Sequence, residues 1–199
     1  MSGPASKDDF EDTEAGYVPT GEQKTVEEYA KLDANDESLA KWKASLGITA
    51  GGGPIIHDSN NPAKVLIENI TLKVAGRPDV SVSLSAPGST AKLASEPFVI
   101  KEGVRYAMVL QFRVQREVVS GLRYLQVVKR KGIKVDKFEE MVGSYGPSKD
   151  VYTKKLAEEE APSGMLARGE YKARSRFIDD DKVVHLDFEW AIVISKDWK

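Results

Sequence analysis

Apolar and polar residues alternate with a period of two along much of the chain beyond residue 65. The alternation is clear around Ile70, Leu72 and Val74, and it returns in residues 80–84, 106–114, 171–177 and 186–194. A period of two places every second side chain on the same face of a β-strand. Several such strands, separated by turns and with little helical pattern between them, predict an all-β antiparallel sandwich.

The same alternation assigns side chains to faces. It predicts that Tyr106 and Met108 share an inward face, that Tyr171, Ala173, Ser175 and Phe177 point inward, and that Leu186, Phe188 and Trp190 do the same. Lys172, Arg174 and Arg176 are expected to point outward. His185 is expected to point outward on its strand, as are Asp187 and Glu189.

The N-terminal quarter has a different pattern. Thr25 and Glu28 have the spacing of a capping box, which predicts a short first helix. Acidic residues in a first turn and Gly47 as a C-cap predict a second helix from Asn35 or Asp36. Its apolar residues Leu39, Trp42 and Leu46 would share one face. Helices this short need something to pack on, either a partner or the rest of the chain.

These patterns divide the chain into three parts. Residues 1–23 are rich in Gly, Pro, Ser, Thr and acidic residues, which predicts a disordered acidic arm. Residues 24–55 form the predicted helix-loop-helix arm and end in a linker, Gly51–Pro54. Residues 56–199 form the predicted sandwich.

Charge is distributed unevenly between these parts. Residues 1–40 hold 11 acidic and 3 basic side chains, whereas residues 41–199 hold 20 and 26, so a net charge of −8 precedes one of +6. The acidic arm is therefore expected to meet basic surfaces elsewhere or on its own body, and nucleic acid is not expected as its partner. The chain has no cysteine, which fits a reducing, cytoplasmic compartment. No apolar run approaches the roughly 20 residues that span a bilayer, so no stable membrane insertion is expected.

Three consecutive aspartates, Asp179, Asp180 and Asp181, separate two alternating segments. Short acidic residues are typical of a turn between antiparallel strands. A metal or acid–base site would need convergent partners, but other acidic residues lie in distant predicted loops and His185 is expected to face away. We therefore expect no metal, no cofactor and no catalytic residue.

Several long stretches closely resemble the Rho GDP-dissociation inhibitor family. They include "LDANDESLAKWK", "FVIKEGVRYAM", "FRVQREVVSGLRYLQVVKRKGIKVDK", "MVGSYGP", "EEEAPSGMLARGEY" and "SRFIDDDK", and the likeness runs from about Tyr17 to the C-terminus. The resemblance implies a non-enzymatic regulator with an immunoglobulin-like sandwich and a flexible N-terminal arm. It implies, as partner in a one-to-one complex, a prenylated Rho-family small GTPase, whose bound GDP the arm would retain and whose geranylgeranyl lipid the sandwich would shelter.

The resemblance also implies roles for particular residues. The positions matching the prenyl pocket are Leu72, Phe98, Tyr106, Val118, Leu125, Ala173 and Trp190, and Ala173 is smaller than the branched residue expected there. The expected GTPase contacts are Tyr17, Asp36, Leu39, Trp42, Leu46, Glu159, Glu160, Asp180 and Asp181. Glu159 and Glu160 would attract the basic segment that precedes the prenylated cysteine. An immunoglobulin-like interaction module without a lipid cavity is the alternative.

Overall fold

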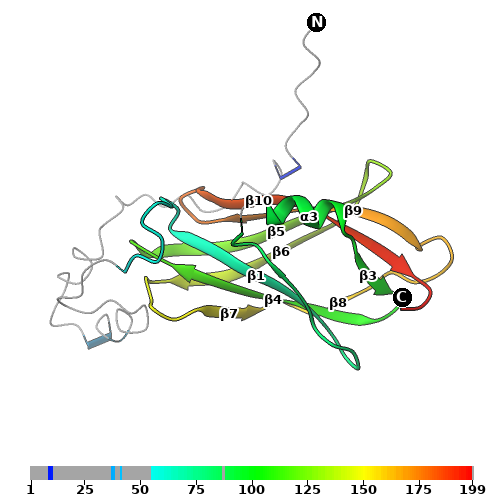
Figure 1. Cartoon of the computed structure of the whole chain (residues 1–199), viewed down its shortest axis with the longest axis horizontal. Helices are drawn as coiled ribbons and strands as arrows, with labels where there is room; N and C mark the ends of the chain where they lie inside the picture. The colour runs from blue at the N-terminus through cyan, green and yellow to red at the C-terminus, as the bar shows by residue number, and fades with distance from the viewer. Residues whose placement is uncertain (1–8, 11–36, 39–40, 42–54, 87, 199) are drawn as a thin grey trace, which may run out of the picture.

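The computed structural model describes residues 9–10, 37–38, 41, 55–86 and 88–198 (Figure 1). The predicted disordered arm, apart from Asp9 and Phe10, lies outside these residues, and so do the predicted first helix and the linker. Within the predicted second helix, Glu37, Ser38 and Lys41 have helical backbone and are exposed. The described part of that segment therefore agrees with the prediction.

Two five-stranded sheets lie face to face (Figure 1). The first sheet has the strand order β2 (Val80–Ser83), β1 (Val65–Val74), β4 (Arg105–Val114) and β7 (Tyr152–Lys155), and β8 (Glu159–Glu160) also pairs with β4. The second sheet has the order β3 (Phe98–Lys101), β10 (Val184–Ser195), β9 (Gly169–Ile178), β5 (Val119–Arg130) and β6 (Ile133–Tyr145). The predicted immunoglobulin-like sandwich is confirmed.

One strand pair departs from the antiparallel prediction. β3 runs parallel to β10, with Phe98 opposite Ile192. A parallel neighbour needs a crossover rather than a hairpin, and the chain reaches β3 from β2 through α3 (Ser89–Ser95). This helix was not predicted. It buries Leu93 and contacts β10.

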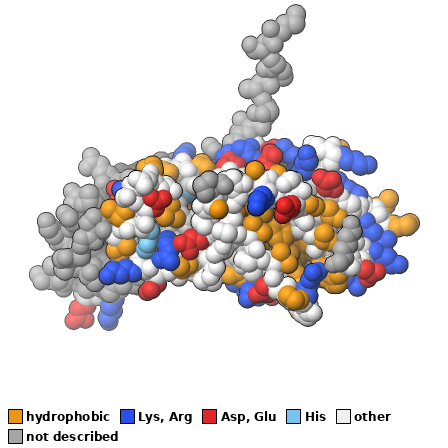
Figure 2. Space-filling view, in the orientation of Figure 1, with side chains coloured by type: hydrophobic (Ala, Val, Ile, Leu, Met, Phe, Trp, Pro, Cys, Tyr) orange, Lys and Arg blue, Asp and Glu red, His pale blue; other side chains and the backbone are white. Residues whose placement is uncertain are grey.

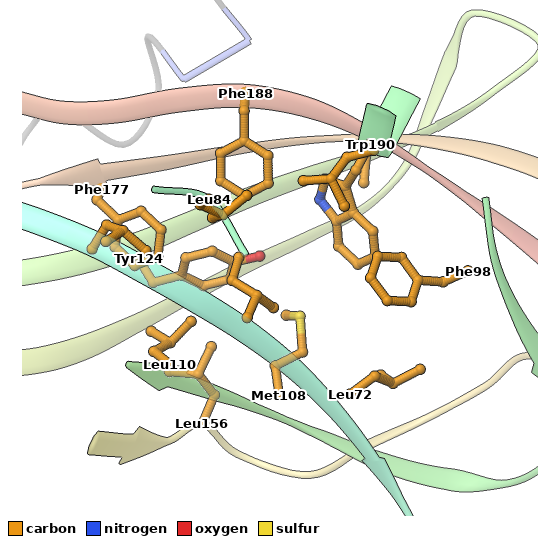
Figure 3. Close-up of a cluster of buried hydrophobic side chains, with 14 of the residues drawn as sticks. Leu72, Leu84, Phe98, Met108, Leu110, Tyr124, Leu156, Phe177, Phe188 and Trp190 are labelled. Carbon is orange, nitrogen blue, oxygen red and sulfur yellow. The ribbon is translucent and has the colours of Figure 1, made fainter. Parts of the chain in front are cut away.

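The main hydrophobic core fills the space between the sheets, where the alternation placed it. On β4, Leu110, Phe112 and Val114 have no exposed surface. Phe177 on β9 and Phe188 on β10 belong to the same cluster, together with Tyr124 on β5 (Figure 3). The residues predicted to face inward on β4 and β9 are buried, and so are Phe188 and Trp190 on β10, whereas Leu186 is only partly buried against the core.

His185 is a correction to the predicted pattern. Its side chain is only 1% exposed, and its Nε2 lies 2.9 Å from Asp179 Oδ2. The β9–β10 pairing skips a residue here, because Val184 lies opposite Ile178 and Leu186 lies opposite Phe177. An extra residue in a β-bulge interrupts the two-residue alternation, and the His185 side chain is buried against Asp179 instead of facing solvent.

Candidate functional site

A small hydrophobic pocket opens between the two sheets near α3. Its lining residues come from both sheets and the helix and are Ile70 and Leu72 (β1), Leu93 (α3), Phe98 (β3), Met108 (β4), and Phe188 and Trp190 (β10). In Figure 3, Leu72, Met108, Phe98 and Trp190 point toward one another. Hydrophobic side chains also gather on the molecular surface just below α3 (Figure 2). The pocket can therefore accept only an apolar group.

A buried polar network fixes one wall of this pocket. The Trp190 indole Nε1 donates a hydrogen bond to Ser175 Oγ at 2.9 Å, and Ser175 is itself 2.8 Å from the Tyr124 hydroxyl. Tyr124 donates to Gln126 Oε1 at 2.7 Å. Phe98 meets Trp190 edge to face, with ring centroids 5.6 Å apart. Satisfied buried networks of this kind hold a side chain in one orientation.

The pocket is nearly closed. Its volume is about 10 Å³, close to the minimum that holds one water molecule. A long lipid chain would therefore enter only if side chains and elements around the pocket move apart. The helix α3 spans seven residues, its only buried side chain is Leu93, and it stands at the pocket wall.

The residues matched to the prenyl pocket fall into three groups. Leu72, Phe98 and Trp190 line the pocket, and Tyr106 and Ala173 lie elsewhere in the same core. Val118 is half-buried in the β4–β5 connection. Leu125 is 2% exposed but lies on the outer face of the second sheet, with Val127 and Ile178. Because Tyr124 points into the sandwich, the next residue must point out.

Four lining residues were not among the positions expected to form the prenyl pocket. Ile70, Met108 and Phe188 have the inward positions that the alternation assigns. The alternation predicts their burial, but it does not distinguish a pocket residue from any other core residue. Leu93 lies on the unpredicted helix α3, where no pattern pointed to it.

An acidic cluster lies beside Tyr106, close to the first residue of β4. The Tyr106 hydroxyl donates a hydrogen bond to Glu159 Oε2 at 3.0 Å, while its ring is buried in the core. Burial raises the pKa of the Glu159 carboxyl, the Tyr106 hydrogen bond opposes this, and Asp136 and Glu140 raise that pKa further. Burial, followed by the charge of Glu159, also raises the pKa of the Tyr106 hydroxyl. Asp136 and Glu140, both on β6, extend the predicted pair Glu159–Glu160 into a larger cluster.

The pocket and the acidic cluster are neighbours on one strand. Tyr106 and Met108 share the inward face of β4, so their Cα atoms are about 7 Å apart along the strand. Met108 lines the pocket and Tyr106 holds Glu159. The two sites are therefore close enough for one elongated ligand to contact both.

The aspartate run forms the β9–β10 turn, as predicted. Asp179 is fully buried, because its carboxylate accepts a hydrogen bond from the Val183 amide at 2.9 Å and contacts His185. Asp180 is half-buried, and its amide donates to the Ser120 carbonyl at 3.0 Å. Asp181 is exposed. Only the last two carboxylates can therefore meet a partner.

Gly121 on β5 makes room for Asp180. It has φ +58°, and a Cβ atom built there would lie 2.0 Å from Asp180 Oδ2. The Asp180 carboxylate thus rests directly on the glycine, which fixes its position beside the exposed Asp181.

Five predicted GTPase contacts, Tyr17, Asp36, Leu39, Trp42 and Leu46, lie outside the described residues. Across the part of the chain that is described, no three His, Asp or Glu side chains come together as a metal site would require. No helix among those residues has the length and apolar character needed to cross a bilayer.

Comparison with known proteins identifies the family. The family model described as RHO protein GDP dissociation inhibitor matches residues 4–197. The chain is 50% identical over 182 residues to the Rho GDP-dissociation inhibitor of Schizosaccharomyces pombe, covering 92% of this chain and 87% of that protein. It is 43% identical over 195 residues to human Rho GDP-dissociation inhibitor 1, covering 98% and 93%. The corresponding Saccharomyces cerevisiae protein is 45% identical over 178 residues, covering 87% and 88%. The chain therefore belongs to the Rho GDP-dissociation inhibitor family.

Proposed function

We propose that this protein binds a prenylated Rho-family GTPase one to one in the cytoplasm, slows release of its GDP and keeps its geranylgeranyl group out of the membrane. It would act by binding and would catalyse no reaction. The observation that carries the proposal is the pairing of a hydrophobic pocket with an acidic cluster along β4. The GTPases expected as partners end in a basic segment followed by a prenylated cysteine, and this order matches the order of the two sites.

The pocket would supply the lipid-binding step. Burial of a lipid chain is worth roughly 0.8 kcal/mol per CH₂, so a protein that removes the chain from a bilayer needs an equally apolar cavity. Leu72, Phe98 and Trp190 would contact the lipid first, since they already face one another. The nearly closed pocket would open as the chain enters, with α3 moving away from β10.

The acidic cluster would orient the GTPase tail. Exposed ion pairs contribute about 0–1 kcal/mol each and weaken with salt, so Glu159 and Glu160 would favour capture more than affinity. Glu159 is better placed than an exposed carboxylate, because Tyr106 fixes it and burial reduces its hydration.

The arm and the β9–β10 turn would together keep GDP bound to the GTPase. Asp180 and Asp181 would contact the GTPase, together with Tyr17, Asp36, Leu39, Trp42 and Leu46 of the arm. Contacts that hold the switch segments still would prevent the nucleotide from leaving, and an arm that orders on binding fits this role.

Extraction from vesicles tests the proposal. A geranylgeranylated Rho-family GTPase bound to liposomes is mixed with increasing amounts of this protein, and the vesicles are sedimented. We expect the GTPase to move to the supernatant at near-stoichiometric inhibitor. A GTPase held on the same vesicles by a fused transmembrane helix should stay with the pellet. If the prenylated GTPase also stays in the pellet, the interaction-module alternative is favoured.

A further inference from the structure

We propose that the outer face of the second sheet is a binding site for an acidic–aromatic peptide motif, and that the chain fills it with its own Asp9 and Phe10. The site lies on β5, β9 and β10, facing away from the first sheet. Figure 1 shows the short N-terminal segment that contains both residues on this side of the sandwich. The site does not overlap the pocket or the acidic cluster, and it does not depend on the proposed function.

The strand register builds the floor of the site. Leu125 on β5 lies opposite Arg176 on β9, which lies opposite Asp187 on β10. The next row on this face pairs Val127 with Arg174. Leu125 and Val127 thus form an apolar strip, bordered by two guanidinium groups.

Phe10 covers that strip completely. Its side chain has no exposed surface, and it forms a cluster with Leu125, Val127 and Ile178 that is separate from the main core. The guanidinium carbons of Arg176 and Arg174 lie 4.5 and 5.5 Å from the ring centroid, within the range of a cation–π contact. A ring on a flat sheet surface would keep part of its area in contact with solvent. Because Phe10 has no exposed area, this outer face of the second sheet must form a pocket around the ring.

Asp187 holds the two arginines in place. Its Oδ1 accepts from Arg174 Nε at 2.8 Å, and its Oδ2 accepts from Arg176 Nε at 2.9 Å. Arg176 is only 6% exposed. A charged side chain is rarely buried so deeply without a partner, and here Arg176 has both the Asp187 carboxylate and the Phe10 ring as partners.

Asp9 adds the acidic half of the motif. Its Oδ1 lies 2.5 Å from Lys129 Nζ, and its Oδ2 lies 3.9 Å from an Arg174 guanidinium nitrogen. The dipeptide therefore matches the site by both shape and charge.

The site extends beyond Asp9. A hollow of about 430 Å³ continues along the same face, lined by Asp9, Val127, Lys129, Lys131, Gly132, Glu170, Lys172, Ala173, Arg174 and Glu189. Four of these side chains are basic and three are acidic, one of which is Asp9 itself. The sequence around the motif, "KDDFEDTE", adds further acidic residues on both sides of it. An excess of basic residues facing an acidic peptide is the complementarity expected of such a site.

The test uses the full chain with and without Phe10. In Phe10→Ala, the site is emptied without a change in the main core, so the protein should stay folded. A synthetic peptide of residues 4–15 is titrated into this variant and into the unmodified chain, and the methyl NMR signals of Leu125, Val127 and Ile178 are followed. The unmodified chain already holds its own motif at an effective concentration in the millimolar range. We therefore expect the same peptide concentrations to move the methyl signals of the unmodified chain at least about tenfold less than those of Phe10→Ala.

Two controls make the result decisive. The same peptide carrying Phe10→Ala should move these signals at least about tenfold less, and raising salt should weaken binding of the unmodified peptide because Asp9 pairs with Lys129. Methyl signals of Leu110, which lies on β4 of the first sheet and faces the core between the two sheets, should not move in any titration. Equal shifts by both peptides, or identical starting spectra for the two proteins at Leu125, Val127 and Ile178, would overturn the proposal.

Discussion

Leu72 and Leu125 are two buried leucines on strands, and they differ in the face they occupy. Leu72 lines the pocket between the sheets, whereas Leu125 lies on the outer face of the second sheet. Replacing either by Ala should lower the free energy of unfolding by about 2–5 kcal/mol. Only Leu72→Ala should lower the affinity for a prenylated GTPase, because only this change removes a contact with the lipid. Binding titrations with a geranylgeranylated GTPase measure this difference.

The unprenylated GTPase serves as the control for this pair. Both variants should bind it as the original protein does. If Leu125→Ala weakened binding of the prenylated form as much as Leu72→Ala, the lipid would have to reach the outer face and the proposed pocket would be wrong.

Glu159 gives a pH dependence with a definite sign. Burial and the neighbouring carboxylates raise its pKa in the free protein, so it takes up a proton at a higher pH than an exposed glutamate does. A basic tail favours the charged form, and binding should therefore weaken as pH falls through this raised pKa. The loss should be at most about 1 kcal/mol, or roughly fivefold in affinity. Titration of a basic peptide between pH 7 and 5 measures it.

Two substitutions check the assignment to Glu159. Glu159→Gln should flatten the pH profile, because the amide does not titrate. Tyr106→Phe should move the weakening to higher pH, because it removes the hydrogen bond that lowers the Glu159 pKa. An unchanged profile in Glu159→Gln would assign the titration to another group.

Single residues were predictable where the alternation was regular. Tyr106, Ala173 and Trp190 were expected to face inward and are buried. His185 was not, because the register shift in β10 is invisible in the sequence pattern. The family resemblance assigns Leu125 to the prenyl pocket. The strand alternation places it on the outer face once Tyr124 faces inward, and the structure agrees with the alternation.

At the scale of elements, the β9–β10 turn depends on β5. Gly121→Ala places a methyl group on the Asp180 carboxylate and forces a positive φ on alanine. We expect destabilisation of about 1–3 kcal/mol from the strained backbone and the clash, and weaker binding to the GTPase because Asp180 and Asp181 move. Thermal unfolding and binding titrations report the two effects separately.

Gly132 on the β5–β6 connection is the matched control. It has φ +82°, but a Cβ atom there would meet nothing within 4 Å. Gly132→Ala should carry the same kind of backbone strain without disturbing the turn, so its GTPase affinity should be unchanged. Equal losses of GTPase affinity in Gly121→Ala and Gly132→Ala would contradict the proposal that the β9–β10 turn contacts the GTPase.

Strands with regular alternation were predictable, whereas the short helix α3 and the long strand β6 were not. Strands β4, β9 and β10 each have at least ten residues, and apolar and polar residues alternate over 106–114, 171–177 and 186–194 within them. The helix α3 has seven residues and a single buried side chain, Leu93, which leaves almost no periodic signal. Because α3 forms one wall of the pocket, the sequence predicted the sandwich better than it predicted the candidate site.

For the whole molecule, we expect the arm and the sandwich to act separately. Among the residues that the structure describes, the buried side chains of the main core come from positions 65–194, so removing residues 1–55 should leave the sandwich folded. The truncated protein should still bind a geranylgeranylated peptide, but it should no longer slow GDP release. Full inhibition by the truncated protein would contradict the role proposed for the arm.

The charge asymmetry was the main prediction at this scale. An acidic arm was expected to meet basic surfaces elsewhere or on its own body, and the ion pair between Asp9 and Lys129 is a contact of the second kind. The sequence could not specify this contact, because it depends on the pairing of β5 with β9, which brings Leu125, Arg174 and Arg176 together on one face.

Release of fluorescent GDP from a geranylgeranylated Rho-family GTPase, compared with its unprenylated form as this protein is titrated in, tests the central claim most directly. We expect GDP release to slow when the arm and the sandwich both contact the GTPase. The slowing should appear at a much lower concentration of this protein for the geranylgeranylated GTPase than for the unprenylated one. Equal slowing of the two forms would contradict the role of the pocket, and no slowing of either would contradict inhibition of GDP dissociation altogether.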